Sequence, residues 1–312
     1  MNRAVQGTVA DAVKDNWVDA LAPAPTRPYL RLSRADRPIG TWLLLLPCWW
    51  AVALAVASHG WHPRALWIAL GCALGAFLMR GAGCTWNDVT DREFDGAVAR
   101  TRSRPIPSGQ VTVRGALAWM AAQALIAFAV LLTFHPLAIG LGIGSLALVA
   151  VYPFAKRFTW WPQMFLGLAF NWGALLAWAA QAGQVPLAAL LLYASGIAWT
   201  LFYDTIYAFQ DIEDDATIGV RSTARLFGTD APRWLAGFAL GATILMALSA
   251  GAALSGWSLV LGLAGAASFG WHLRRQMRGL DLADPAACLA AFRSNRDAGL
   301  IPLPFFAAAA LV

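Results

Sequence analysis

Long uninterrupted apolar stretches are the feature of this 312-residue sequence that most restricts its fold. A helix needs about 20 predominantly apolar residues to cross the hydrocarbon core of a bilayer. Stretches such as 41–57 do not alternate between polar and apolar residues, which argues against a transmembrane β-barrel. We therefore expect nine membrane-spanning helices, at 39–58, 64–86, 114–134, 136–155, 162–183, 186–208, 231–252, 255–273 and 298–312.

Composition supports this interpretation. Hydrophobic residues make up 59% of the chain and charged residues 13%, whereas soluble domains average about 45–50% and about 25%. Such a chain is neither a soluble globular domain nor a disordered or disulfide-rich protein. The sequence predicts an all-α polytopic membrane protein, with a flexible N-terminal tail at 1–28 and a single transmembrane domain at 29–312.

Positive charge is unevenly distributed between the two sides of the predicted bundle. If the N-terminus is cytoplasmic, all Lys and Arg residues except Arg64 and Arg80 fall in cytoplasmic segments, as the positive-inside rule requires. The net charge of +6 then reflects orientation and contact with anionic membrane lipid, so we expect no nucleic-acid partner. The N-terminal stretch does not resemble an Arg- and Ser-rich transit peptide, which favours a bacterial inner membrane over a mitochondrial one.

Acidic residues are scarce and concentrated. Nine of the 17 Asp and Glu residues lie in two short stretches, 88–95 and 204–215, each at the cytoplasmic end of a predicted span. Ionisable groups at membrane depth are costly and usually line a functional cavity. The four cysteines and four histidines, by contrast, have no metal-ligand spacing, so zinc and haem sites lack support.

The spacing of the acidic residues predicts two polar stripes. Asn87, Asp91 and Asp95 are four residues apart, so on a helix they share one face. Asp204, Asp211 and Asp215 are spaced by seven and four residues, so they also share one face, with Tyr203 and Tyr207 close to it. Each stretch could be a solvated helix end, but a cation between the carboxylates would also remove their repulsion. Oxygen ligands of this kind suit Mg²⁺ or Mn²⁺.

Two acidic stripes with Mg²⁺ can hold a diphosphate, because Mg²⁺ shares its ligand shell with substrate phosphates. Nearby cations would complete the phosphate site; the candidates are Arg100, Arg102, Arg104, Lys156, Arg157, Arg221 and Arg225. A diphosphate site at the mouth of an apolar bundle indicates a lipid diphosphate substrate.

Four sequence strings resemble the UbiA-type intramembrane prenyltransferases. N-D-V-T-D-R-E-F-D-G at 87–96 is similar to the first aspartate motif of that family, and Y-D-T-I-Y-A-F-Q-D-I-E-D-D at 203–215 to the second. V-Y-P-F-A-K-R-F-T-W-W-P-Q at 151–163 resembles its middle loop, and R-A-D-R-P-I-G at 34–40 the entry to its first helix. The surrounding residues are most similar to members that prenylate 4-hydroxybenzoate in ubiquinone synthesis.

The resemblance implies about nine helices around a central cavity under a cytoplasmic cap, and it implies roles for individual residues. Mg²⁺ would be held by Asn87, Asp91, Asp95, Asp211 and Asp215, and the diphosphate by Arg100, Arg104, Lys156 and Arg221. The aromatic acid would be oriented by Arg157, with Arg80 as a second candidate. Aromatic walls would stabilise the prenyl cation, and the candidates are Tyr203, Tyr207 and Trp86. Asp204 or an acid of the first motif would assist proton loss.

The expected reaction transfers a polyprenyl group from its diphosphate to the ring carbon ortho to the hydroxyl of 4-hydroxybenzoate. Two alternatives remain open at this point: a prenyltransferase that uses homogentisate or a naphthoate, and a cation-coupled transporter. The acids lie at one membrane face, whereas transporter sites typically lie at the midplane. Prenyl chain length and oligomeric state are not determined by the sequence.

Overall fold

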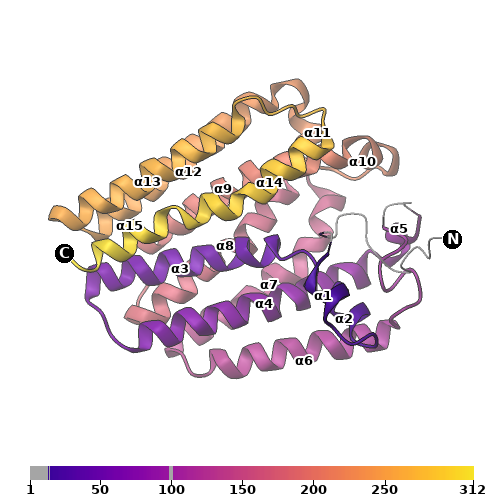
Figure 1. Cartoon of the computed structure of the whole chain (residues 1–312), viewed down its shortest axis with the longest axis horizontal. Helices are drawn as coiled ribbons and strands as arrows, with labels where there is room; N and C mark the ends of the chain where they lie inside the picture. The colour runs from indigo at the N-terminus through magenta and orange to yellow at the C-terminus, as the bar shows by residue number, and fades with distance from the viewer. Residues whose placement is uncertain (1–12, 14, 98–100) are drawn as a thin grey trace. The chain divides into compact units, whose positions relative to one another are not determined.

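The computed structural model describes residues 13, 15–97 and 101–312, and the side chains of these residues except 94, 97, 214, 215 and 218. Over these residues the chain is helical and contains no β-strand (Figure 1). The α-helices are α1 (Trp17–Ala20), α2 (Arg27–Leu32), α3 (Ile39–His59), α4 (Arg64–Thr90), α5 (Arg92–Ala97), α6 (Val113–Leu131), α7 (Pro136–Phe158), α8 (Pro162–Ala182), α9 (Leu187–Ala208), α10 (Ile212–Ile218), α11 (Thr223–Phe227), α12 (Ala231–Ala253), α13 (Gly256–Met277), α14 (Pro285–Leu300) and α15 (Pro302–Ala309). Two 3₁₀ turns, η1 (Phe209–Asp211) and η2 (Gly228–Asp230), precede α10 and α12.

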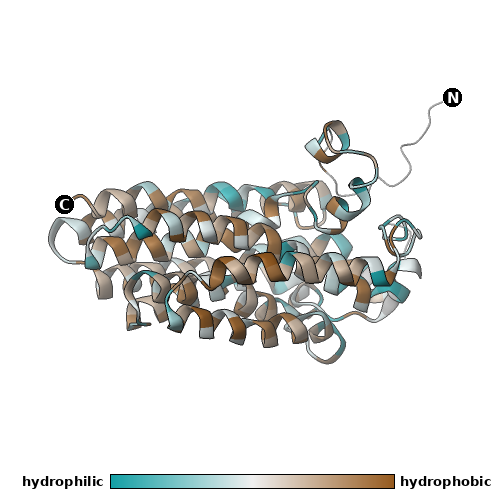
Figure 2. Ribbon diagram, turned by 90° about the horizontal axis from the view of Figure 1, so that it is seen from below, coloured by the Kyte–Doolittle hydropathy of each residue, from teal (hydrophilic) through white to brown (hydrophobic). Residues whose placement is uncertain are grey.

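Seven helical segments of the described chain are long and apolar enough to cross a membrane. They contain α3, α4, α6, α7, α8, α9 and α12, and they coincide with the first seven expected spans. Figure 2 shows apolar residues along most of the length of these helices. The prediction of an all-α, multi-pass membrane protein is confirmed.

The last two expected spans differ from the prediction of nine. The span expected at 255–273 is helix α13, which is long enough but does not belong to the seven. Its Gly, Ser and His residues lower its mean hydropathy. The span expected at 298–312 was wrong as a single helix, because the chain divides there into α14 and α15 at Ile301. Pro302 lacks the amide hydrogen that would continue α14, and it suits the first turn of a new helix.

Helix α14 occupies a segment between the last two expected spans. Its start has a recognisable signal: Pro285 at the first turn, preceded by Asp284, whose side chain accepts a hydrogen bond from the Ala286 amide. Asn295 in α14 is fully buried and accepts a hydrogen bond from Trp199 Nε1 on α9 at 2.8 Å. Tertiary packing thus makes a helix of a segment too polar to be predicted as a span.

The chain divides into two compact units, which we describe separately. Unit 1 comprises residues up to 42 and 73–131, and unit 2 comprises 43–72 and 132–312. In unit 1, Ser33 at the end of α2 donates a hydrogen bond to Gln123 Oε1 and accepts one from Trp119 Nε1, both on α6. Gly81 on α4 faces the Ser33 and Gln123 side chains so closely that a Cβ would lie 2.0 Å from Gln123 Oε1. These contacts join α2, α4 and α6.

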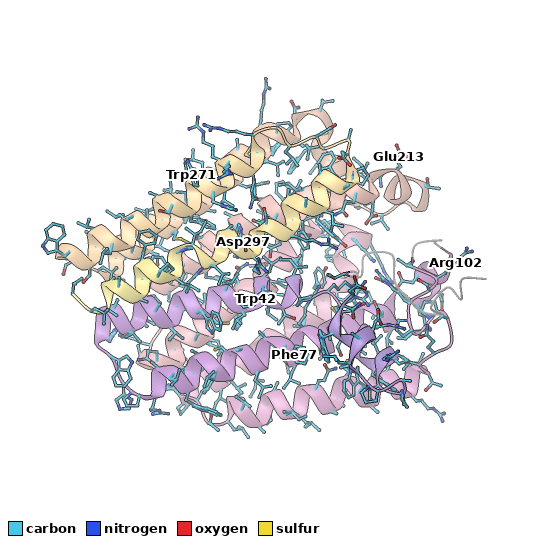
Figure 3. The ribbon with its side chains drawn as sticks, viewed as in Figure 1. Trp42, Phe77, Arg102, Glu213, Trp271 and Asp297 are labelled. Atoms are coloured by element: carbon cyan, nitrogen blue, oxygen red, sulfur yellow. The ribbon has the colours of Figure 1, made fainter. Side chains whose placement is uncertain are left out.

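The N-terminal part of unit 1 packs onto its own core. Val18 in α1 is fully buried with Ala22 and Ala35, and Phe77 on α4 packs against this cluster (Figure 3). Trp17 Nε1 donates a hydrogen bond to the Ala35 carbonyl at 2.9 Å. Residues 17–22 of the expected tail at 1–28 are therefore packed against the core of unit 1. The flexibility of the tail as a whole stays a prediction.

Helix α9 is central to unit 2, where it packs against α8, α12 and α14. Hydrogen bonds between helices recur along it. Ser195 Oγ donates to the Ala242 carbonyl of α12 at 2.7 Å, and Asn171 Nδ2 of α8 donates to Thr200 Oγ1 at 2.8 Å. Polar side chains commonly link helices inside membranes in this way. The second acidic stretch of unit 2 therefore begins at the end of α9, a helix that is held by three neighbouring helices.

The stability of unit 1 should depend on Asp19 at acid pH. Burial raises the pKa of Asp19, but hydrogen bonds from Arg31 and Asn16 and the nearby positive charges outweigh this and lower it. A carboxylate with a lowered pKa in the folded state stabilises the fold above its unfolded pKa of about 3.9. This contribution is lost as the pH falls through the folded pKa.

We expect Asp19→Asn to lower the thermal unfolding temperature at pH 7 and to reduce its fall between pH 5 and pH 2. Thermal unfolding in detergent across this range measures both. Asp15→Asn is the matched control, because Asp15 is exposed and Asn tolerates its positive φ of 55°. Equal pH dependence in wild type and Asp19→Asn would contradict the assignment.

Candidate active site

The first acidic stretch continues the C-terminal end of α4 in unit 1. The Asp91 amide donates to the Asn87 carbonyl at 2.9 Å, and the Asp95 amide donates to the Asp91 carbonyl at 2.8 Å. These bonds carry helical register through the bend at Asp91 and into α5. Asn87, Asp91 and Asp95 therefore lie one turn apart. Asp91 is fully buried and Asn87 half-buried.

Two arginines meet the carboxylates of this stretch. Arg34 Nη2 lies 2.6 Å from Asp88 Oδ1, and Arg104 Nη1 lies 3.4 Å from the same oxygen. Arg104 Nη1 also lies 2.7 Å from Asp95 Oδ2. Asp88 is fully buried, and the Arg34, Arg104 and Asp95 side chains are largely buried. The four residues form a continuous chain of ion pairs with alternating charge.

Arg34 reaches Asp88 from an unusual backbone conformation. It follows the end of α2 with a φ of 58°. Its amide donates to the Arg31 carbonyl, and the Ala35 amide donates to the Leu30 carbonyl, both at 3.0 Å. This pair of bonds is the Schellman motif, whose left-handed residue is usually glycine. An arginine here bears a conformational cost of about 1–2 kcal/mol, and its side chain compensates with the ion pair to Asp88.

The donor atoms of this stretch fit Mg²⁺. Burial raises the pKa of Asp95, and the charges of Asp88 and Asp91 raise it further, while Arg104 only partly opposes them. Additional positive charge would therefore be favourable here. Among the described residues, no group of three or more His, Cys, Asp or Glu side chains forms a ready metal centre. Mg²⁺ does not require one, because it retains waters and binds one or two carboxylates together with substrate phosphates.

Two other predicted cations of unit 1, Arg80 for the aromatic acid and Arg102 for the phosphate site, have different surroundings. The Arg80 guanidinium lies directly over Gly40 at the start of α3, where a Cβ would be 2.4 Å from Arg80 Nε. A residue larger than glycine at position 40 would push this guanidinium away. Arg102 is exposed in the loop after α5 (Figure 3). Arg100 lies outside the described residues.

The second acidic stretch follows the end of α9 in unit 2. Asp204 lies in the last turn of α9, Asp211 ends the 3₁₀ turn η1, and both side chains are half-buried. A 3₁₀ turn has three residues per turn instead of 3.6, so Asp211 is rotated relative to the single straight helix that the spacing predicted. The side chain of Asp215, in α10, is outside the described side chains.

Aromatic side chains support this stretch from one side. Tyr203 is fully buried, and its hydroxyl lies 3.0 Å from Thr200 Oγ1. Its ring contacts Phe292 of α14 at a centroid distance of 5.8 Å, and the Tyr207 ring contacts Phe292 at 4.5 Å. Tyr203 therefore takes part in the core of unit 2, whereas Tyr207 is half-buried. Trp86, the third aromatic candidate, is half-buried in unit 1.

A second group of cations in unit 2 gathers around Trp160. The guanidinium carbons of Arg221 and Arg225 lie 5.7 Å and 5.4 Å from the centre of the Trp160 ring. Arg221 Nη1 donates to the Phe158 carbonyl at 2.9 Å, and the Arg221 amide donates to the Lys156 carbonyl. The end of α7 and the loop before α11 are thereby joined. Two guanidinium groups at one ring repel each other unless an anion lies between them.

Arg157 is exposed at the end of α7, with its guanidinium 5.1 Å from the Phe154 ring centre. Its neighbour Lys156 is half-buried. The structure thus brings the end of α7, with Lys156 and Arg157, next to the segment at the start of α11 that carries Arg221 and Arg225, as a phosphate or carboxylate site would require.

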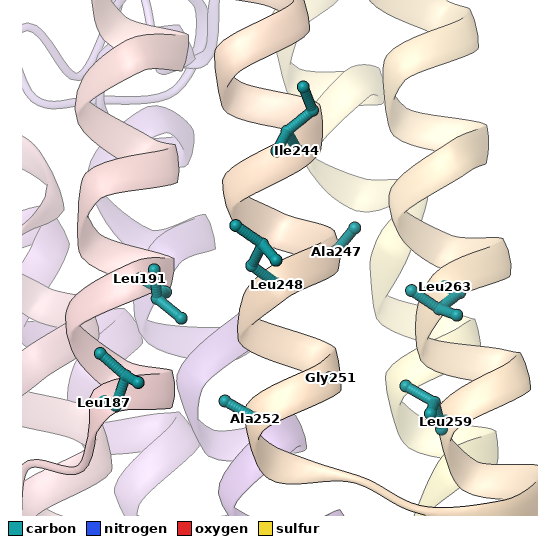
Figure 4. A pocket seen from close by; sticks show the side chains of 9 residues that line it. All are labelled: Leu187, Leu191, Ile244, Ala247, Leu248, Gly251, Ala252, Leu259 and Leu263. Atoms are coloured by element: carbon teal, nitrogen blue, oxygen red, sulfur yellow. The ribbon is translucent and has the colours of Figure 1, made fainter.

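An apolar groove of about 720 Å³ lies elsewhere in unit 2, between α9, α12 and α13 (Figure 4). It is lined by Leu187, Leu191, Ile244, Ala247, Leu248, Gly251, Ala252, Leu259 and Leu263. It offers no polar group for a diphosphate. Leu187 and Asp204 are separated by most of α9, about 25 Å at 1.5 Å per residue. This groove is therefore not the predicted central cavity, which stays a prediction.

Sequence reasoning missed several residues at these sites. Asp88 lies within the first acidic stretch, but it is off the predicted stripe of Asn87, Asp91 and Asp95. Arg34 begins the string at 34–40 that resembles the entry to the family's first helix, but it was given no role in the site. Phe292 comes from a distant segment and carried no local signal. Trp160 lies in the string at 151–163 that resembles the family's middle loop, but the sequence did not show that two arginines lie beside its ring.

Comparison with known proteins agrees with these observations. The UbiA prenyltransferase family matches residues 44–299. The mitochondrial 4-hydroxybenzoate polyprenyltransferase of Bos taurus is 48% identical over 285 residues, which cover 90% of this chain and 74% of the relative. The enzyme of the same name from Arabidopsis thaliana is 46% identical over 288 residues, covering 92% and 69%.

Solved structures share the fold. A UbiA homolog from Aeropyrum pernix K1 superimposes with a TM-score of 0.69 at 24% identity, covering 84% of this chain and 96% of that one. A UbiA homolog from Archaeoglobus fulgidus, bound to GPP and Mg²⁺, gives a TM-score of 0.65 at 20% identity, covering 91% and 100%. With both acidic stretches and the apolar helices in place, this chain belongs to the UbiA prenyltransferase family.

Proposed function

We propose that this protein transfers a polyprenyl group from polyprenyl diphosphate to the ring carbon ortho to the hydroxyl of 4-hydroxybenzoate, a step of ubiquinone synthesis. The observation that carries the proposal is the first acidic stretch. There, buried Asp88, Asp91 and Asp95 lie with arginines at the end of an apolar helix. Relatives named for this reaction, 44–48% identical to the chain, support the choice of acceptor.

Both acidic stretches take part in binding the diphosphate in this proposal. Asn87, Asp91 and Asp95 would hold Mg²⁺ in unit 1, and Asp211 and Asp215 would do so in unit 2. Bound Mg²⁺ supplies positive charge that stabilises the departing diphosphate. The solved structure of the UbiA homolog from Archaeoglobus fulgidus, which is bound to GPP and Mg²⁺, supports this choice of metal.

The cations of the chain divide between the two substrates. Arg100, Arg104, Lys156 and Arg221 would neutralise the diphosphate as the allylic carbon–oxygen bond breaks. Arg157 would bind the carboxylate of the aromatic acid, with Arg80 as the other candidate. Each of the arginines can donate two parallel hydrogen bonds to a carboxylate or phosphate.

Aromatic and acidic groups would act on the prenyl cation and on the ring. Tyr207 and Trp86 can stabilise the cation by cation–π contact and exclude water. Because Tyr203 is buried against Thr200 and Phe292, its contribution would be to support Tyr207. After the ring carbon bonds to the prenyl group, Asp204 would accept the proton that restores aromaticity.

The protein acts in an inner membrane in this proposal, with the acidic stretches on the side of the positively charged loops. The named relatives are mitochondrial, whereas the sequence favoured a bacterial inner membrane. Membrane lipid is the one partner besides the two substrates that the proposal requires.

An assay of the purified protein in lipid tests the proposal. We supply geranyl diphosphate and 4-hydroxybenzoate, with Mg²⁺ or with EDTA, and measure prenylated product by mass spectrometry. We expect product only with the metal. Diphosphate release without product would mean that the metal site is right and the acceptor wrong; homogentisate and a naphthoate are tested next. Absence of both in a folded sample would overturn the proposal.

The Mg²⁺ ligands should be sensitive to loss of a single charge. We expect Asp91→Asn and Asp211→Asn each to lower kcat/KM by about 100-fold or more, as for other groups that stabilise charge in a transition state. Glu93→Gln and Glu213→Gln are matched controls, because both are exposed acids in the same two stretches. Activity within about threefold of wild type in either Asp variant would remove that residue from the metal site.

Arg157→Ala should act on the aromatic acid. Loss of a charge-assisted hydrogen bond to its carboxylate should raise the KM for 4-hydroxybenzoate by about 10- to 150-fold, with little change in the KM for the prenyl donor. Steady-state kinetics with each substrate varied in turn measures both. An effect confined to the prenyl donor would reassign Arg157 to the diphosphate.

Trp160 should act through the two arginines beside it. We expect Trp160→Leu to raise the KM for geranyl diphosphate by about 5- to 30-fold, since each cation–π contact contributes about 0.5–1 kcal/mol at exposed sites. Trp160→Phe should largely restore the wild-type value. Trp271→Leu is the control, because Trp271 also contacts an arginine, Arg275, away from the acidic stretches. Equal KM values in the Leu and Phe variants would contradict this role.

A further inference from the structure

We propose that Arg104 is an exchangeable cation: it occupies the Asp95 carboxylate in the metal-free protein and leaves it when Mg²⁺ binds there. Asp88 is then the positioning residue that holds Arg104 after it leaves. The inference rests on the proposed function, because it takes Asp95 as an Mg²⁺ ligand. It concerns unit 1 alone.

Arg104 is placed between two carboxylates at unequal distances. Its Nη1 atom is 2.7 Å from Asp95 Oδ2 and 3.4 Å from Asp88 Oδ1. The shorter contact is an ordinary charge-assisted hydrogen bond, and the longer one is at the limit of such bonds. In the metal-free protein Arg104 therefore neutralises chiefly Asp95, the carboxylate that Mg²⁺ needs.

Asp88 can form a closer contact with Arg104 than the present one of 3.4 Å. Among the described residues, its Oδ2 atom and the Nε atom of Arg104 are both buried without a hydrogen-bond partner. A buried donor or acceptor without a partner is unfavourable. Rotation of the Arg104 side chain toward Asp88 would allow these two atoms to bond to each other. Asp88 can therefore bind Arg104 once Arg104 has left Asp95.

Arg34 holds Asp88 in place from the opposite side. Its Nη2 atom is 2.6 Å from Asp88 Oδ1, and its backbone keeps a φ of 58° where glycine is usual. Backbone strain of this kind at a charged residue indicates that the side chain has a function. With Arg34 fixed, Asp88 can receive Arg104 without moving.

The backbone around Arg104 is also restrained. Thr101 Oγ1 donates to the Asp95 carbonyl at 2.9 Å, and the Arg104 amide donates to the Thr101 carbonyl at 2.9 Å. Ser108 Oγ donates to the Arg104 carbonyl at 2.6 Å. The main chain therefore stays with the acidic stretch, and the exchange requires rotation of the Arg104 side chain alone.

The exchange predicts that loss of the Arg104 charge has opposite effects on two affinities. The metal alone should bind more tightly, and the metal together with diphosphate should bind more weakly. Without diphosphate, Arg104 competes with the metal for Asp95. With diphosphate, the released guanidinium is an additional cation beside the anion. A residue needed only for folding would weaken both kinds of binding, and a residue that binds only phosphate would leave binding of the metal alone unchanged.

The experiment measures Mn²⁺ affinity of the full chain in lipid by electron paramagnetic resonance, with and without inorganic diphosphate. We expect Arg104→Gln to tighten binding of Mn²⁺ alone by at least about fivefold and to weaken binding of Mn²⁺ with diphosphate by about tenfold. Arg114→Gln is the matched control, because Arg114 is an exposed arginine of unit 1, at the start of α6, that has no part in the proposed site. It should change neither affinity by more than about twofold.

Asp88→Asn tests the positioning role. Without Asp88 as a partner, Arg104 stays on Asp95, so Mn²⁺ alone should bind about fivefold more weakly than to the wild type. Adding Arg104→Gln should remove this loss. A loss that persists in the double variant would mean that Asp88 acts on the metal directly, which would overturn its role as the holder of Arg104.

Other outcomes are equally decisive. If Arg104→Gln weakens binding of Mn²⁺ alone or leaves it unchanged, while wild type binds Mn²⁺, the exchange is overturned and the proposed function stands. If wild type binds no Mn²⁺ with or without diphosphate, the proposed function fails and the exchange with it. Should Arg104→Gln fail to fold, Arg104→Lys, which retains the charge but not the planar fork, is expected to shift both affinities in the same directions by smaller factors.

Discussion

A bilayer offers no water to the polar groups of a chain that crosses it, and most of this structure follows from that constraint. The backbone satisfies its amides within helices, and side chains such as Ser195 and Asn171 bond to neighbouring helices. The same constraint applies to charge at the ends of the helices. Asp88 is fully buried and is accordingly met by two guanidinium groups. Charge is kept in such a place only where a network supports it.

The features that depend on local sequence could be predicted. Apolar length located seven spans, and the spacing of acids placed both acidic stretches at helix ends. Features that depend on distant contacts could not. The burial of Asn295 makes α14 part of the core, and the conformation of Arg34 depends on Asp88, 54 residues away. The 3₁₀ turn at Asp211 was also missed, because residue spacing does not reveal a local tightening of the helix.

The two acidic stretches are built differently, although their sequences look alike. In unit 1, two arginines contact the carboxylates of Asp88 and Asp95 directly. In unit 2, Asp204 and Asp211 lie at the end of α9 and just after it, where the rings of Tyr203, Tyr207 and Phe292 pack together. Two arginines there, Arg221 before α11 and Arg225 within it, lie beside the ring of Trp160 instead. The first acidic stretch is thus in direct contact with positive charge, and the second is packed against aromatic rings.

The hydrogen bond between Trp50 and the end of α14 has a consequence for the order of assembly. Trp50 Nε1 donates to the Gly299 carbonyl at 2.7 Å, across 249 residues of chain. At about 5–20 residues per second, a ribosome needs about 10 to 50 s to complete that stretch. During this time α3 is already in the membrane without its last partner. The growing chain is therefore only partly packed during synthesis. The contact between α3 and α14 can form only when the chain is almost complete.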